Sequence, residues 1–152
     1  KKLSKKLSYR FSGIDKLIEQ KEGCSINIIF KNKTEQYFRK LEREITLNEL
    51  KKDKSVIALG GGAFLNNSIR RSVKKIATSF WIDVSVQTLL KRLSKTKKRP
   101  LLLKKNLNEA VNKIYFERKK IYNEADYRIK CNYLKIDEAV NKILKLYENT
   151  RD

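Results

Sequence analysis

Hydrophobic and polar positions follow two periods along this chain, which predicts short strands separated by helices. Apolar residues three and four positions apart predict amphipathic helices over 16–22, 33–50, 69–76, 86–93, 107–122 and from Asp137 onward. Short apolar runs predict strands at Tyr9–Ser12, Ser55–Leu59, Phe80–Asp83 and Tyr127–Cys131. Strands that alternate with helices indicate an α/β fold, with a parallel sheet sandwiched by helices.

Three local patterns refine this prediction. Gly23 is expected to end the helix over 16–22. The segment Ser25–Phe30 fits either a strand or a short helix capped by Ser25. Leu3, Leu7 and Phe11 recur at helical spacing, as in the closing half of an amphipathic helix.

Length and composition indicate one folded domain spanning residues 1–152. A hydrophobic fraction of 40% supplies a core, although 36% of the residues are charged. Histidine is absent, which removes the commonest neutral-pH base and metal ligand. Cys24 and Cys131 lie far apart, so a zinc site or disulfide framework is not expected. No apolar run reaches the roughly 18 residues of a membrane span, and we predict a cytoplasmic protein.

The charge balance is strongly basic, with 37 Lys and Arg against 17 Asp and Glu and a net charge of +20. Such a balance is a known signal for nucleic-acid binding. Here the excess of Lys and Arg is spread along the whole chain. This spread favours basic residues on solvated faces over a dedicated nucleic-acid-binding surface. A basic nucleic-acid-binding module still fits the composition.

Several residues are candidates for chemistry, each with a plainer interpretation. Gly60-Gly61-Gly62 follows a predicted strand, where α/β sheets bind ligands, or forms an ordinary tight turn. Asp15 follows the first predicted strand and either orients a substrate hydroxyl or caps a helix. Arg39 and Glu42 are three residues apart on a predicted helix. They form either a surface pair or a clamp in which Glu42 orients Arg39 toward a carboxylate.

Five motifs in order make the sequence much more specific. They are Phe11-x-Gly13-x-Asp15, Glu35-x-x-Phe38-Arg39-x-x-Glu42, Gly60-Gly61-Gly62, Arg99-Pro100-Leu101-Leu102 and Glu117-Arg118-x-x-x-Tyr122-x-x-x-Asp126. Together these motifs resemble the shikimate kinase family, and the resemblance runs from Leu3 to about Leu146.

The resemblance implies a small P-loop kinase that transfers the γ-phosphoryl of ATP, with Mg²⁺, to the 3-hydroxyl of shikimate in chorismate and aromatic amino-acid biosynthesis. Asp15 matches the family's residue that binds the substrate hydroxyls and is the candidate base. Arg39 and Arg118 match the arginines that hold the shikimate carboxylate. The backbone of Gly61 is expected to contact the substrate.

The resemblance also implies a lid and a nucleotide site. Arg99 matches an arginine of the lid loop, at about 95–107, that closes over the ATP phosphates, and Arg92 lies where the family approaches the adenine. Residues expected to line the substrate pocket are Phe30, Phe38, Gly60 and Gly62. A monomer with small-molecule substrates and no membrane or nucleic-acid partner is expected.

Two departures from the family pattern affect the phosphate side. No G-x-x-x-x-G-K-[ST] motif occurs in the chain, and Gly13 stands where the family places a magnesium-binding acid. No metal ligand is therefore assigned among these residues. The chain is either an N-terminal truncation or has lost catalysis. Its start inside a helix without Met favours the truncation.

This interpretation has consequences for the sheet and for activity. The family's central first strand, between Ser55–Leu59 and Phe80–Asp83, would be lacking, and a gap is expected there. The chain alone is expected to be inactive. A gluconate-kinase-like enzyme and a non-catalytic shikimate-binding remnant are also compatible with the sequence.

Overall fold

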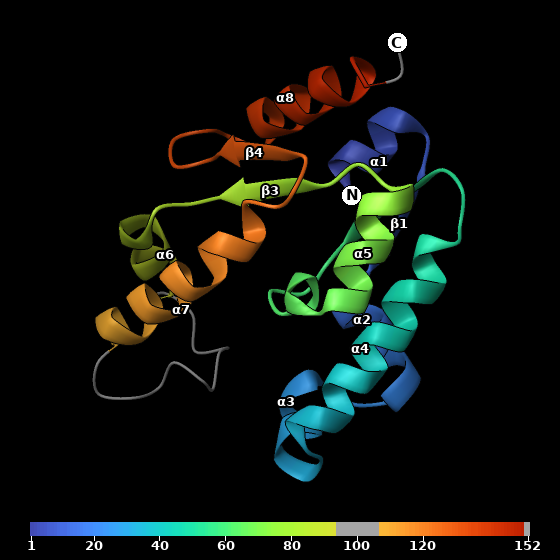
Figure 1. Ribbon diagram of the computed structural model, residues 1–152, viewed down its shortest axis with the longest axis vertical. Helices are drawn as coiled ribbons and strands as arrows, with labels where there is room; N and C mark the ends of the chain where they lie inside the picture. Colours follow the sequence, from blue (N-terminus) through green and yellow to red (C-terminus); the bar gives the residue numbers. More distant parts are fainter. Residues whose placement is uncertain (94–106, 151–152) are drawn as a thin grey trace. The chain divides into compact units, whose positions relative to one another are not determined.

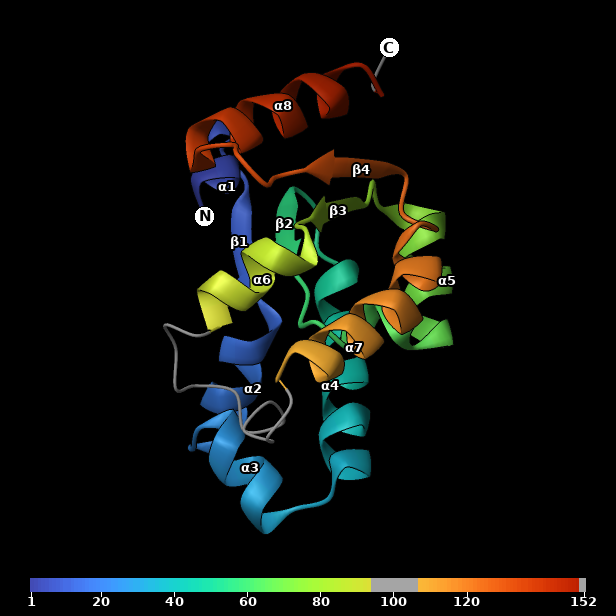
Figure 2. The same cartoon turned by 90° about the vertical axis from the view of Figure 1, so that its left-hand side faces the viewer.

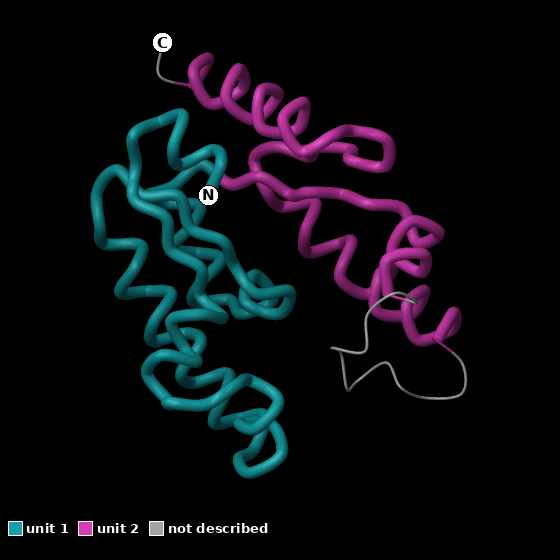
Figure 3. Tube along the Cα trace, turned by 180° about the vertical axis from the view of Figure 1, so that it is seen from behind, with its two compact units in different colours: residues 1–78 teal, residues 79–152 magenta. Residues whose placement is uncertain are grey.

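The computed structural model describes residues 1–93 and 107–150, which form two compact units. Residues Lys1–Thr78 make up the first unit and Ser79–Asp152 the second (Figure 3). The prediction of one domain over 1–152 stays a prediction. Both units consist of two parallel strands with helices around them.

The first unit contains two strands and six helical segments (Figure 1). In chain order they are α1 (Lys2–Leu7), β1 (Arg10–Gly13), α2 (Ile14–Glu22), α3 (Ile26–Asn32), α4 (Glu35–Leu50), β2 (Ser55–Ala58), the 3₁₀ helix η1 (Ala63–Leu65) and α5 (Asn67–Ile76).

The helix α4 is the central element of the first unit and contacts α2, α3 and α5. It begins after Thr34, whose hydroxyl accepts a hydrogen bond from the backbone N–H of Tyr37 at 3.2 Å. Its residues Phe38 and Leu41 are buried with the isoleucines of α2 and α3. The strands β1 and β2 pair in parallel, from Arg10 beside Ser55 to Gly13 beside Ala58.

The second unit has β3 and β4 at its centre. Its described elements are β3 (Phe80–Asp83), α6 (Val86–Leu93), α7 (Leu107–Tyr122), β4 (Tyr127–Lys130) and α8 (Ile136–Glu148). The strands pair in parallel, from Phe80 beside Tyr127 to Asp83 beside Lys130. In both views α8 lies beside β4, whereas α7 lies on the β3 side of the pair (Figures 1 and 2).

The expected strands and most helices are confirmed to within about two residues at each boundary. The gap expected between the second and third strands stays a prediction. In the part of the chain that the structure describes, β2 pairs with β1 and β3 pairs with β4, in two separate ladders. The uncertain segment at Ser25 is the helix α3. Ser25 is its N-cap residue, but the side chain of Glu19 accepts the N–H of Ile26.

Two sequence predictions were wrong at element boundaries. The helical spacing of Leu3 and Leu7 does not extend to Phe11, which lies in β1, as the predicted strand Tyr9–Ser12 has it. The helix α1 ends at Leu7, because its C-cap residue Ser8 is in the left-handed region with φ 54° and the chain then becomes extended. The last helix begins at Ile136, one residue before the predicted cap Asp137. There the backbone N–H of Lys135 donates to the carboxylate of Glu138 at 2.6 Å, so Glu138 satisfies the helix start.

None of the described helices is both long enough and apolar enough to cross a membrane.

A buried carboxylate, Glu49, joins the end of α4 to β1. The hydroxyl of Ser12 donates to its Oε2 at 2.6 Å, and the ammonium of Lys52 contacts its Oε1. Burial alone raises the pKa of Glu49. The hydrogen bonds from Lys52 and Ser12 outweigh burial, so its pKa lies below the ordinary value of 4.5.

We predict that Glu49→Gln lowers the free energy of unfolding at pH 7 by about 1–3 kcal/mol. The folded protein protonates Glu49 at lower pH than the unfolded chain does. The contribution of Glu49 is therefore present above pH 4.5 and is lost as the pH falls through the folded-state pKa. Urea unfolding of both proteins between pH 3 and 7 measures the difference between their free energies of unfolding at each pH.

The control variant is Glu44→Gln, which removes an exposed ion pair between Glu44 on α4 and Lys21 on α2. Its effect on the unfolding free energy should stay within about 0.5 kcal/mol. Equal losses in both variants would contradict the assigned role of Glu49.

Candidate active site

Asp15 lies just beyond the end of β1, in the first turn of α2. The interpretation of Asp15 as the N-cap residue is wrong, because Gly13 occupies that position with extended backbone. The side chain of Asp15 reaches Gly60, where a methyl group would lie 2.6 Å from its Oδ1. Asp15 is also exposed, so a bound molecule could reach it.

Arg39 lies on α4 and is held by two carboxylates of the same helix. Its Nη1 donates to Oε2 of Glu42 at 2.8 Å. Its Nε and Nη2 donate to Oε1 of Glu35 at 3.2 and 3.1 Å. The Glu42 side chain is 3% exposed and that of Glu35 is 64% exposed. The Glu42 contact is therefore the one shielded from water.

These carboxylates keep Arg39 charged. Burial lowers the pKa of Arg39, but hydrogen bonds and charge from Glu42 and then Glu35 outweigh it, so the pKa lies above its ordinary value. The interpretation of Arg39 and Glu42 as an ordinary surface pair is not supported, because Glu42 is buried. Glu42 orients the guanidinium instead.

The run Gly60–Gly62 follows β2 and lies against these same side chains. A methyl group at Gly60 would lie 2.9 Å from Oε1 of Glu42 as well as against Asp15. At Gly62 it would lie 2.7 Å from Cζ of Arg39. The glycines therefore let the backbone approach three charged side chains, and the interpretation as an ordinary tight turn is insufficient. Gly61, between them, is exposed.

Phe38 and Phe30 lie next to this cluster. Their ring centroids are 4.7 Å apart, and Cζ of Arg39 lies 5.2 Å from the Phe38 centroid. Phe38 is only 4% exposed and belongs to the core of the first unit, and Phe30 packs against that core. Packing is thus an observed role for both residues.

The remaining predicted residues belong to the second unit. Arg118 lies on α7 and Arg92 in the last turn of α6. Arg99 and the predicted lid loop lie outside the described residues, except that Leu107 begins α7. The structure brings Asp15, Arg39 and the glycines together, whereas their convergence with Arg118 stays a prediction.

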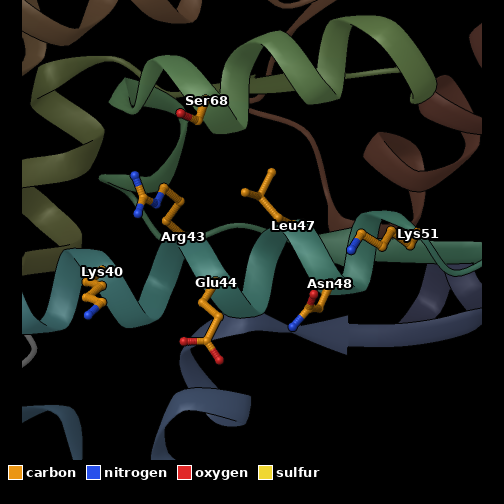
Figure 4. Close-up of a pocket in the computed structure, with 7 residues that line it drawn as sticks. All are labelled: Lys40, Arg43, Glu44, Leu47, Asn48, Lys51 and Ser68. Atoms are coloured by element: carbon orange, nitrogen blue, oxygen red, sulfur yellow. The ribbon is translucent and has the colours of Figure 1, made fainter.

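A surface hollow of the first unit lies elsewhere than this cluster. It has a volume of about 410 Å³ and is lined by Lys40, Arg43, Glu44, Leu47, Asn48, Lys51 and Ser68. Arg43 and Leu47 extend from α4 toward α5, and Glu44 points to the opposite side (Figure 4). This hollow includes none of the residues that the sequence motifs single out.

Within residues 1–93 and 107–150, no three His, Cys, Asp or Glu side chains gather as metal ligands. Gly13, at the position expected for a magnesium-binding acid, contributes no side-chain ligand.

Nearly the whole sequence matches a known family model. The model for shikimate kinase matches residues 1–148. The chain belongs to the shikimate kinase family. The shikimate kinase of Sulfurihydrogenibium sp. is 39% identical over 142 residues, covering 93% of this chain and 84% of that protein. The shikimate kinase of Persephonella marina is 38% identical over 144 residues, covering 95% of this chain and 87% of that protein.

Solved shikimate kinases have the same fold. The Aquifex aeolicus structure is similar with a TM-score of 0.85 at 36% identity, covering 98% of this chain and 87% of that one. The structure of the Acinetobacter baumannii enzyme in complex with shikimate is similar with a TM-score of 0.91 at 28% identity. The match covers 97% of this chain and 83% of that one. The fold is therefore the α/β fold of P-loop kinases, and the family is one of phosphotransferases. The gluconate-kinase-like and nucleic-acid-binding interpretations lose their support.

In this shikimate kinase family member, sequence reasoning assigned no role to Glu35 and left the role of Glu42 open. Glu35 was only a motif position, yet it contacts two nitrogens of Arg39. Its spacing of four residues from Arg39 was the available signal. That Glu42 is buried depends on tertiary packing, which the sequence does not display.

We predict that Gly62→Ala displaces the guanidinium of Arg39, because the new methyl group would overlap it. The ¹⁵Nε resonance of Arg39 should shift and its exchange with water should quicken. Gly13→Ala is the matched control, since its methyl group would meet Phe11 at an ordinary 3.5 Å. An unchanged Arg39 resonance in Gly62→Ala would contradict this geometry.

Proposed function

We propose that this chain binds shikimate with its first unit and takes part in transfer of the γ-phosphoryl of ATP to the 3-hydroxyl of shikimate. The observation that carries this proposal is the cluster of Arg39, Glu42 and Asp15 against the glycine run. A small acid with several hydroxyl groups needs a cationic fork, a carboxylate and backbone donors. The cluster offers the fork and the carboxylate, and the glycine run is proposed to supply the backbone donors.

Arg39 is proposed to bind the carboxylate of shikimate. Its Nε and Nη2 face the exposed Glu35, whose contact is weak because water competes for it. A substrate carboxylate would replace Glu35 at that edge of the guanidinium. Glu42 would keep its hold on Nη1 and maintain the orientation of the fork.

Asp15 is proposed to bind the substrate hydroxyls and to accept the proton of the attacking one. It is exposed and close to Gly60, so a hydroxyl could lie between its carboxylate and the backbone of Gly61. Phosphoryl transfer depends mainly on positioning and charge neutralisation. One well-placed acceptor of a proton therefore suffices on this side of the reaction.

The other roles come from the family resemblance and are proposed on that basis. Arg118 would hold the shikimate carboxylate with Arg39, Arg92 would lie near the adenine, and Arg99 would close over the phosphates. Residues proposed to line the substrate pocket are Phe30, Phe38, Gly60 and Gly62. A monomeric state and a cytoplasmic location are proposed with them.

The phosphate-binding strand is proposed to come from a segment outside these 152 residues. Support comes from the lack of G-x-x-x-x-G-K-[ST] in the sequence and from the two separate ladders in the described part. Magnesium would accompany the ATP, and no step is assigned to it. Without such a segment the chain would act only as a shikimate-binding remnant.

We predict that Arg39→Ala weakens shikimate binding by about 2–5 kcal/mol, because it removes a partner of a desolvated carboxylate. Isothermal titration calorimetry with shikimate measures this. Arg43→Ala is the control, because Arg43 is an exposed arginine of the same helix beyond the cluster. Binding unchanged by Arg39→Ala, or no binding by the unmodified chain, would contradict the proposed function.

Asp15→Asn should lower kcat by about 10²–10⁴-fold, because the amide cannot accept the proton. The KM for shikimate should change much less, since an amide still hydrogen-bonds hydroxyl groups. The assay uses the chain joined to a strand that carries G-x-x-x-x-G-K-[ST], with ADP release as the signal. Near-normal turnover would exclude Asp15 as the base.

A further inference from the structure

In the second unit, one buried carboxylate joins both strands to α7. Asp83, the last residue of β3, is 6% exposed. Its Oδ2 accepts hydrogen bonds from Nε and Nη2 of Arg128 on β4, at 2.9 and 2.7 Å. Its Oδ1 accepts one from the hydroxyl of Tyr115 on α7, at 3.1 Å. Each oxygen is thus bonded to a different element.

The same sheet face makes a second contact with α7. Trp81 is two residues before Asp83, so both side chains lie on one face of β3. In the ladder Trp81 is paired with Arg128, whose guanidinium lies 4.7 Å above the Trp81 ring. The Trp81 ring also contacts the ring of Tyr122, with centroids 5.8 Å apart. The face therefore meets α7 at Tyr115 and at Tyr122.

These two contacts flank Arg118. Tyr115, Arg118 and Tyr122 have the spacing i, i+3 and i+7, which places them along one face of the helix. The two tyrosines are about 10 Å apart along the axis. Two contacts at that separation fix the rotation of α7 about its axis. They also fix the position along the axis of the helical turn that carries Arg118.

The hydroxyl of Tyr115 remains a donor at neutral pH. Burial, and next the hydrogen bond to Asp83, raise the pKa of Tyr115 above its ordinary value. The Tyr115 ring keeps its packing without the hydroxyl, because it lies edge-on to Phe116 with centroids 5.6 Å apart. Replacing Tyr115 by Phe therefore removes the hydrogen bond and little else.

We propose that Asp83 and Tyr115 are positioning residues for Arg118, fixing the rotation of α7 so that the guanidinium of Arg118 is presented to the acceptor carboxylate. The inference rests on the proposed role of Arg118. It assigns a function to two residues that lie outside the family motifs found in the sequence. The Tyr122–Trp81 contact fixes the other end of the same turn.

The experiment is a double-mutant cycle read out by calorimetric titration with shikimate. Tyr115→Phe should weaken binding about fivefold, and Arg118→Ala about thirtyfold or more. Because Tyr115 acts through Arg118, the double variant should bind no more weakly than Arg118→Ala alone. Tyr133→Phe is the matched control, since Tyr133 is 97% exposed. It should not change the affinity.

Asp83→Ala provides a second variant, which removes both the acceptor of the Tyr115 hydroxyl and the charge that faces Arg128. It should show the same coupling to Arg118. Melting temperatures of all variants separate loss of fold from loss of positioning. If Asp83 and Tyr115 only stabilised the fold, their substitutions would lower the melting temperature. They would also weaken shikimate binding by the same factor whether residue 118 is arginine or alanine.

Two results would overturn the inference alone. One is wild-type affinity in Tyr115→Phe, and the other is an equal loss of affinity with and without Arg118. If Arg118→Ala itself leaves shikimate binding unchanged, the proposed role of Arg118 is wrong and the inference fails with it. A loss of binding in Arg39→Ala would still support the first-unit site, so the two failures are distinguishable.

Discussion

The buried carboxylate of Glu42 is the constraint on which the first unit's site depends. A charge removed from water is costly unless it is paired, and Arg39 supplies that pair from the same helix. The pair fixes the guanidinium beside the turn that follows β2. That turn can approach it only because Gly60 and Gly62 carry no side chain. The parallel register of β1 and β2 then brings Asp15, which lies just beyond β1, to the same place.

Carboxylates have a similar task elsewhere in the chain. Glu49 joins the end of α4 to β1, and Asp83 joins β3 to β4 and α7. In each case the acid is buried and bonded to two partners, at least one of them cationic. Acids are scarce in this protein, with 17 against 37 bases. Several of the scarce acids are therefore located where a strand and a helix must be held together.

The residues proposed for the site in the first unit belong to the acceptor side of phosphoryl transfer and not to the nucleotide side. Fixed arginines and backbone donors can bind a carboxylate and hydroxyl groups without moving when the reaction occurs. A triphosphate needs a nest of consecutive backbone N–H groups, which G-x-x-x-x-G-K-[ST] provides and this sequence lacks. The composition of the proposed site is thus consistent with the family. The chain supplies residues for the acceptor side of the reaction, whereas its sequence lacks the motif that binds the triphosphate.

The sequence by itself determined the alternation of strands and helices, because apolar periodicity reports directly which residues face a core. It also determined the family, since five motifs in order specify far more than any one. Helical spacing carried the first helix too far, to Phe11, and the cap of the last helix was wrongly placed at Asp137. The left-handed Ser8 and the side chain of Glu138 decide these two boundaries. Only the tertiary structure decided that Glu42 is buried, that Gly62 touches Arg39, and that Asp83 bonds Tyr115. The last two contacts join residues distant in the chain, and burial changes the strength of a charge pair in a way that no local pattern records.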